Sequence, residues 1–146
     1  MHFDIMVGSV LGASEYVAEA ILVSITEAGH TGECHFEPTV STLNKDNLLL
    51  ICTSTHGAGD LPDNIESYAK ALASKDLQGL NAMIIGLGDS SYDTYCGAAM
   101  KMETLLLDRG ATLLSEPLHI DVLNHPIPED IAVEWFVAQL DKVSGK

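Results

Sequence analysis

The stretch "FDIMVGSVLGASEYVAEAI", residues 3–21, passes from a strand pattern into a helix pattern within a few residues. Residues 3–7 form a short apolar run typical of a buried strand. From residue 14 to residue 28 apolar side chains recur at every fourth position between Val17 and Ile25, which predicts one buried face of a helix. The intervening "GSVLGAS" holds two glycines and two serines. A strand that turns into a helix through such a loop predicts an α/β fold with a phosphate-sized site at the helix N-terminus.

The rest of the chain repeats this alternation of strands and helices. We predict strands over residues 33–37, 48–54, 82–88 and 117–121, and helices over residues 63–73, 98–109 and 129–143, with Asp63 or Asn64 capping the second helix. Two of the strands are continuously apolar, as strands covered on both faces are. We therefore expect one domain, residues 1–146, with a five-stranded parallel sheet in the order 2-1-3-4-5 and helices on both faces.

The charge, the length of the apolar runs and the cysteines limit which kind of protein this is and which partners it can bind. The 146 residues include 7 basic and 21 acidic side chains, for a net charge of −14. This balance argues against binding nucleic acid or an anionic membrane surface, and favours docking on basic partners, although it also serves plain solubility. No apolar run is long enough for a membrane helix, and no signal peptide pattern is present. The three cysteines form no CxxC pair, so we expect reduced thiols in a cytoplasmic protein.

Three loops rich in glycine and hydroxyl groups follow predicted strands 1, 3 and 4. They are "GSVLGAS" (residues 8–14), "STHGAGDLPDN" (residues 54–64) and "GLGDSSYDTYCGA" (residues 86–98). In this topology, ligands bind beyond the carboxyl ends of the strands, where these loops meet. The first loop has no Lys or Arg, so backbone N–H groups and the Ser9 and Ser14 hydroxyls would hold one phosphate monoester; a triphosphate loop needs a lysine. The alternative is a tight turn that binds nothing.

The second and third loops add flat side chains to this edge of the sheet. His56 lies in the second loop, and Tyr92 and Tyr95 lie in the third. Faces from two loops could enclose a planar ring, with backbone groups around its polar edge. Each side chain alone is more often solvated or packed on its own domain, but their convergence favours a binding site.

The three loops resemble those of the flavodoxin-like FMN-binding family, and among them the short-chain MioC-type flavodoxins and the FMN domains of diflavin reductases. The family's phosphate loop reads roughly G-S-x-T-G-x-A-E, and this chain has "GSVLGASE". Its second loop often reads A-T-Y-G-x-G-D-x-x-D-N, matched here by "TSTHGAGDLPDN" from Thr53. Its third reads G-L-G-[DN]-x-x-Y-x-x-[FY], matched by "GLGDSSYDTY". The match covers essentially the whole chain and implies the family's three-layer α/β sandwich.

The resemblance implies FMN as the cofactor, with its phosphate in the first loop, its isoalloxazine between the other two, and Tyr92 as the main stacking face. Leu11 stands where a threonine is common, so one phosphate hydrogen bond must come from elsewhere. His56 replaces the usual Tyr or Trp, which weakens stacking. The implied cofactor contacts are Ser9, Val10, Leu11, Gly12, Ala13, Ser14, Ser54, Thr55, His56, Gly57, Ala58, Leu87, Gly88, Asp89, Tyr92, Tyr95 and Cys96.

The resemblance implies an electron carrier without catalytic residues or a metal site. A basic flavodoxin reductase would supply electrons, and an acceptor redox enzyme, biotin synthase by the MioC resemblance, would take them in a transient complex. The main alternative is a flavodoxin-like NAD(P)H:quinone reductase. A hydrolase built on "GDSS" with Asp121 and His125 is disfavoured because the D-x-x-x-H spacing and the missing G-x-S-x-G do not fit. A receiver domain would need an acidic pair where Gly8 and Ser9 stand.

Overall fold

The sheet is entirely parallel in the computed structural model, which describes residues 1–9, 12–55, 59–91 and 95–143. Its strands are β1 (His2–Gly8), β2 (Thr31–His35), β3 (Leu48–Ser54), β4 (Asn81–Gly88), β5 (Thr112–Leu113) and β6 (Leu118–Asp121). They are ordered β2-β1-β3-β4, and β5 and β6 both pair with β4. The reversal of strand order lies between β1 and β3, as predicted.

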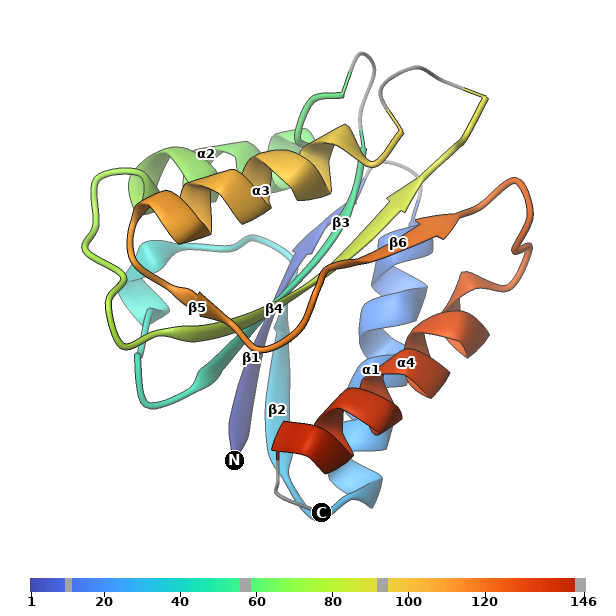
Figure 1. The fold of residues 1–146 in the computed structure, drawn as a ribbon, viewed down its shortest axis with the longest axis horizontal. Coiled ribbons are helices and arrows are strands. Elements are labelled where there is room, and N and C mark those ends of the chain that lie inside the picture. The colour runs from blue at the N-terminus through green and yellow to red at the C-terminus, as the bar shows by residue number, and fades with distance from the viewer. Residues whose placement is uncertain (10–11, 56–58, 92–94, 144–146) are drawn as a thin grey trace.

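In the part of the chain that the structure describes, four α-helices cover the sheet in two layers. They are α1 (Ala13–Glu27), α2 (Asp63–Leu72), α3 (Gly97–Asp108) and α4 (Pro128–Val143), with a short 3₁₀ helix, η1 (Val40–Thr42). Figure 1 shows α1 and α4 on one face and α2 and α3 on the other. The predicted α/β sandwich is therefore confirmed. Among the described residues, no helix has the length and apolar content needed to cross a membrane.

Alternating side chains of β1 divide the core between the two faces. Phe3, Ile5 and Val7 pack with the apolar residues of α1 and α4, whereas Met6 packs with those of α2 and α3. β3 and β4 contribute apolar side chains to both clusters, as strands buried on both faces must. The parallel register directs the carboxyl ends of β1, β3 and β4 to one edge of the sheet.

Two sequence predictions differ from the structure in detail. The expected fifth strand is β6, but its place beside β4 is shared with the short β5, because β5 pairs with Asn81–Ala82 and β6 pairs further along with Ile85–Gly88. The expected second strand lies two residues too late. β2 begins at Thr31 because its pairing with β1 starts at His2. The predicted helices agree with the observed ones to within a residue at each end.

Candidate functional site

The first predicted loop is anchored by a side chain from α2. Asn64 Oδ1 accepts a hydrogen bond from the Ser9 N–H at 2.9 Å, and Asn64 Nδ2 donates to the Val7 and Phe36 carbonyl oxygens at 2.7 and 3.0 Å. Asn64 therefore does not cap α2, whose N-cap residue is Pro62. The predicted capping role is wrong because the Asn64 amide instead bonds to three backbone groups, two at the end of β1 and one at Phe36.

The start of α1 presents backbone donors rather than a capping side chain. Gly12, the N-cap residue, has φ 90°, a left-handed conformation that favours glycine, and its N–H donates to Ser9 Oγ at 2.9 Å. No side chain caps this helix within the described residues. The first N–H groups of a helix have no partner inside it, so this end suits an anion. Val10 and Leu11 lie outside the described residues.

Ser14 is fully buried, and its hydroxyl is already engaged inside the protein. Its Oγ donates to the Gly8 carbonyl oxygen at 2.6 Å and accepts from Ser54 Oγ at 3.2 Å. The Ser14 hydroxyl, predicted to donate to a phosphate, instead donates to Gly8 and so links the end of β1 to α1. Ala13 and Ser14 would contribute their backbone N–H groups instead.

The second and third loops are joined where glycine backbones touch. A Cβ atom on Gly97 would lie 2.8 Å from the Gly59 Cα. A side chain at position 97 would therefore force the two loops apart. The Ala98 N–H also donates to Thr55 Oγ1 at 3.4 Å. His56, Gly57 and Ala58 lie outside the described residues. The structure thus brings Thr55 beside the start of α3.

The third loop closes back on the end of β4. Cys96 is buried and has φ 52°, a left-handed backbone conformation that is uncommon for a residue with a side chain. The Tyr95 ring lies edge-on to the His119 ring at 6.2 Å. Burial raises the pKa of Tyr95 to about 12 and that of Cys96 to about 11, so both are neutral at pH 7. Tyr92 lies outside the described residues.

Side chains of this loop differ in what they offer a ligand. Leu87 faces the core beside α1 and α4, so only its backbone is available. Asp89 Oδ1 accepts from the Ser91 N–H at 2.9 Å and from Ser91 Oγ at 2.6 Å. Both interactions shape the turn after β4.

Asp121, at the end of β6, organises the same turn and was not among the predicted cofactor residues. Its carboxylate accepts hydrogen bonds from the N–H and hydroxyl of Ser90, the Leu123 N–H and the Asn124 side chain. The Ser90 hydroxyl, chiefly, lowers the pKa of Asp121. In a hydrolase triad the serine hydroxyl bonds to a histidine, whereas here it bonds to the carboxylate directly. Asp121 therefore holds the loop after β4 in place.

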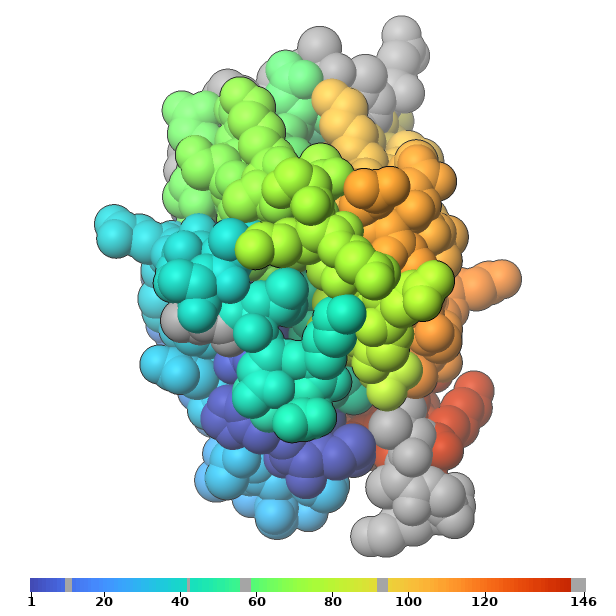
Figure 2. All heavy atoms as spheres, turned by 90° about the vertical axis from the view of Figure 1, so that its left-hand side faces the viewer, coloured from blue at the N-terminus to red at the C-terminus, as the bar shows by residue number. Residues whose placement is uncertain are grey.

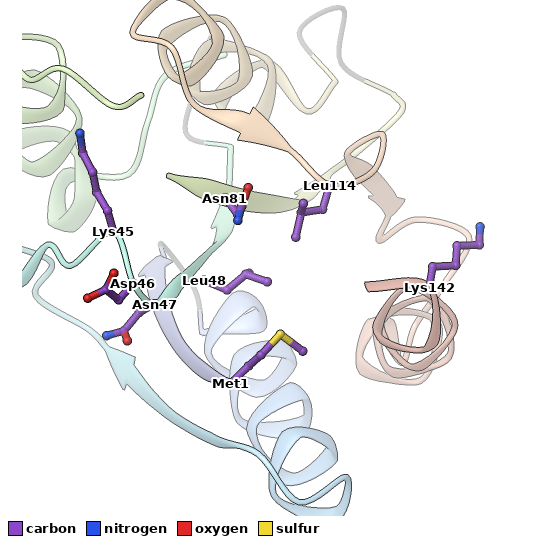
Figure 3. A pocket seen from close by; sticks show the side chains of 8 residues that line it. All are labelled: Met1, Lys45, Asp46, Asn47, Leu48, Asn81, Leu114 and Lys142. Atoms are coloured by element: carbon purple, nitrogen blue, oxygen red, sulfur yellow. The ribbon is translucent and has the colours of Figure 1, made fainter. Parts of the chain in front are cut away.

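A separate hollow lies at the opposite edge of the sheet. It has a volume of about 560 Å³ and is lined by Met1, Lys45, Asp46, Asn47, Leu48, Asn81, Leu114 and Lys142. Leu48 and Asn81 begin β3 and β4, so this hollow is at the amino ends of the strands. Figure 3 shows Lys45 and Lys142 on opposite sides of it, pointing away from one another. None of the predicted cofactor residues that the structure describes lines it.

The described part of the predicted site therefore combines an uncapped helix start with two loops that meet through glycines. A family model described as Flavodoxin matches residues 5–135. The chain belongs to the flavodoxin family. It is 44% identical to Protein MioC of Escherichia coli O157:H7 over 130 residues, 88% of each chain, and 41% identical to the MioC homolog of Haemophilus influenzae over 92% of this chain and 94% of that one. The structure of a point mutant of flavodoxin from Pseudomonas aeruginosa superimposes with a TM-score of 0.87 at 29% identity, over 94% of this chain and 95% of that one.

These similarities make the protein a MioC-type short-chain flavodoxin, an FMN-binding carrier of electrons rather than an enzyme. The residues fit FMN, since the α1 N-terminus offers N–H groups to a phosphate, and the loops after β3 and β4 lie together at the same edge of the sheet, where a flat ring could bind. Membership of the flavodoxin family argues against the alternatives of a hydrolase, a receiver domain and a quinone reductase.

Proposed function

We propose that this flavodoxin takes electrons from a basic flavodoxin reductase and passes them to an acceptor redox enzyme, with biotin synthase as the candidate acceptor, in transient complexes. The observation that carries the proposal is the net charge of −14 on a MioC-type flavodoxin. Such a surface attracts a basic partner over a distance without requiring a large permanent interface. The free thiols Cys34, Cys52 and Cys96 support a cytoplasmic location, and residues 1–146 would act as one FMN-binding domain.

Bound FMN supplies the redox chemistry; the protein holds and orients it. We assign the phosphate to the loop from Ser9 to Ser14, where the backbone N–H groups at the start of α1 replace the missing lysine. The ring is assigned to residues 54–58, 87–89, 92, 95 and 96. Neutral Tyr95 and Cys96 add no charge there.

We expect the apoprotein to bind FMN about 100-fold more tightly than riboflavin, equivalent to about 2.7 kcal/mol, because only FMN offers a phosphate to the α1 N-terminus. FAD should also bind more weakly than FMN, since a terminal monoester suits this loop. Fluorescence titration of apoprotein with the three flavins measures the affinities. Equal affinity for riboflavin and FMN would contradict the proposal that this loop binds the phosphate, but would not bear on the fold.

Electron transfer from a basic flavodoxin reductase should slow by about tenfold between low and high salt, because salt screens the attraction that speeds encounter. Stopped-flow reduction of the FMN-loaded protein across an ionic-strength series measures the rate. Reduction by a neutral small-molecule reductant is the control and should not vary. A salt-independent rate with the reductase would mean that the acidic surface serves solubility alone.

A further inference from the structure

Away from the cofactor edge, two histidines and two carboxylates gather on β1 and β2. His2 and Asp4 alternate along β1, and Glu33 and His35 alternate along β2. The parallel register pairs Asp4 with Glu33. All four side chains therefore project from the face of the sheet that also carries Met6, whereas Cys34 projects from the other. We refer to these four residues as the β1–β2 cluster.

Asp4 is the centre of the β1–β2 cluster. It is 7% exposed, and it is the only charged residue buried among those that the structure describes. Its Oδ1 lies 3.5 Å from His2 Nε2 and 3.3 Å from His35 Nε2, so two imidazoles converge on one oxygen. His35 Nε2 also lies 3.9 Å from Glu33 Oε2. Ligand atoms of His2, Asp4 and Glu33 all lie within 4.8 Å of one another.

We propose that the β1–β2 cluster binds a divalent transition-metal ion, with Zn²⁺ as the best match, through His2, Asp4, Glu33 and His35. Zinc takes four nitrogen or oxygen ligands at about 2.0–2.2 Å, which places neighbouring ligand atoms about 3.3–3.6 Å apart in a tetrahedron. The separations of Asp4 Oδ1 from His2 Nε2 and His35 Nε2, 3.5 and 3.3 Å, meet this requirement. His35 lies outside the group of His2, Asp4 and Glu33 whose ligand atoms are all within 4.8 Å of one another, so binding of the ion requires the His35 ring to move closer to His2 and the exposed Glu33 carboxylate to rotate. Two imidazoles select zinc or its neighbours over Mg²⁺ and Ca²⁺.

The surroundings of the cluster hold its ligands in place. His2 Nδ1 lies 2.7 Å from Thr31 Oγ1, so the hydroxyl can fix the ring with Nε2 toward Asp4. The other Asp4 oxygen, Oδ2, accepts from Asn47 Nδ2 at 3.0 Å. Histidines and carboxylates that bind metals commonly have their second polar atom held in this way. Figure 2 shows the segment around residues 40–50 (teal) lying against the amino-terminal residues (dark blue).

The proposed ion would join the edge strand β2 to its neighbour β1. The cluster draws on the amino-terminal half of β1, and Ser9 follows the carboxyl end of that strand. We therefore assign it a role in stability rather than electron transfer. The family resemblance implied no metal site, and the four residues come together only when β1 and β2 are aligned.

The test uses the FMN-loaded full chain, freed of any affinity tag and stripped of metal with a chelator. Equilibrium dialysis against Zn²⁺ should give one ion per chain, and competition with a chromophoric chelator gives the affinity. The double variant His2→Gln/His35→Gln should bind at least about 100-fold more weakly. Thr31→Val removes only the hydroxyl and should weaken binding by about 10–100-fold. Zn²⁺ should raise the Tm of the wild type and not that of the double variant.

Matched controls separate the site from general binding to an acidic surface. His125→Gln and Glu37→Gln change the same residue types outside the cluster and should leave Zn²⁺ affinity unchanged. Glu33→Gln alters an exposed side chain, so it should fold and still weaken binding. Retained visible FMN absorption confirms that each variant is folded. A wild type that binds no Zn²⁺, or a double variant that binds it equally well, would show that the cluster is only a set of histidine–carboxylate contacts.

Discussion

Replacing Asn64 with leucine is expected to lower both the stability of the protein and its affinity for FMN. Leucine keeps much of the volume but removes hydrogen bonds to the Ser9 N–H and to the Val7 and Phe36 carbonyl oxygens. Because these backbone groups are then partly buried without a partner, we expect the free energy of unfolding of the apoprotein to fall by about 2–4 kcal/mol. Ser9 begins the proposed phosphate loop, so we expect the FMN Kd to rise at least about tenfold, or about 1.4 kcal/mol.

Urea unfolding and FMN titration measure the two effects separately. Asn44→Ala is the control, because its exposed side chain accepts a local hydrogen bond from the Asp46 N–H at 2.9 Å. That variant should change neither quantity by more than about 1 kcal/mol. If Asn64→Leu bound FMN as tightly as wild type, the position of Ser9 would not matter to the cofactor, and the phosphate would have to be assigned elsewhere.

Replacing Gly88 with alanine should weaken FMN binding by disturbing the loop after β4. A Cβ atom at this position would lie 2.6 Å from the Cys96 backbone nitrogen, 3.0 Å from its Sγ and 3.1 Å from Tyr95 Cδ1. The nearest obstacle is backbone, so the segment at Tyr95 and Cys96 must move. Overpacking of this kind costs about 1–3 kcal/mol of stability. Because Tyr95 and Cys96 belong to the proposed ring site, we expect the FMN Kd to rise about tenfold or more.

Gly79→Ala is the matched control for this substitution. A Cβ on Gly79 meets nothing within 4 Å, but the residue has φ 88°, so alanine should cost about 1–2 kcal/mol of stability through backbone strain alone. Gly79 precedes β4 at the edge of the sheet opposite the loops, so the FMN Kd should not change. Equal FMN affinities for the two variants would contradict a role for the Gly88–Cys96 contact in the site.

Part of the candidate site could be predicted because its signals are local. The glycine and serine pattern between residues 8 and 14 predicted the strand–loop–helix turn, and the structure has β1 ending at Gly8 and α1 beginning at Ala13. The same reasoning missed Asn64 and Asp121. Asn64 contacts Ser9 from 55 positions away, and Asp121 contacts Ser90 from 31 positions away. No pattern within a window of the sequence contains such a pair.

The sequence by itself determined the order of strands and helices, the strands buried on both faces and the edge of the sheet where the glycine-rich loops meet. These follow from hydrophobic periodicity and loop chemistry, which act between residues a few positions apart. Only the tertiary structure decided that the Ser14 hydroxyl is used inside the protein and that Asn64 anchors a loop rather than capping a helix. It also decided that Asp4 lies between His2 and His35. Each of these depends on contacts between different helices, strands or loops. Which groups come within hydrogen-bond distance is set by how the helices and strands pack in the folded protein.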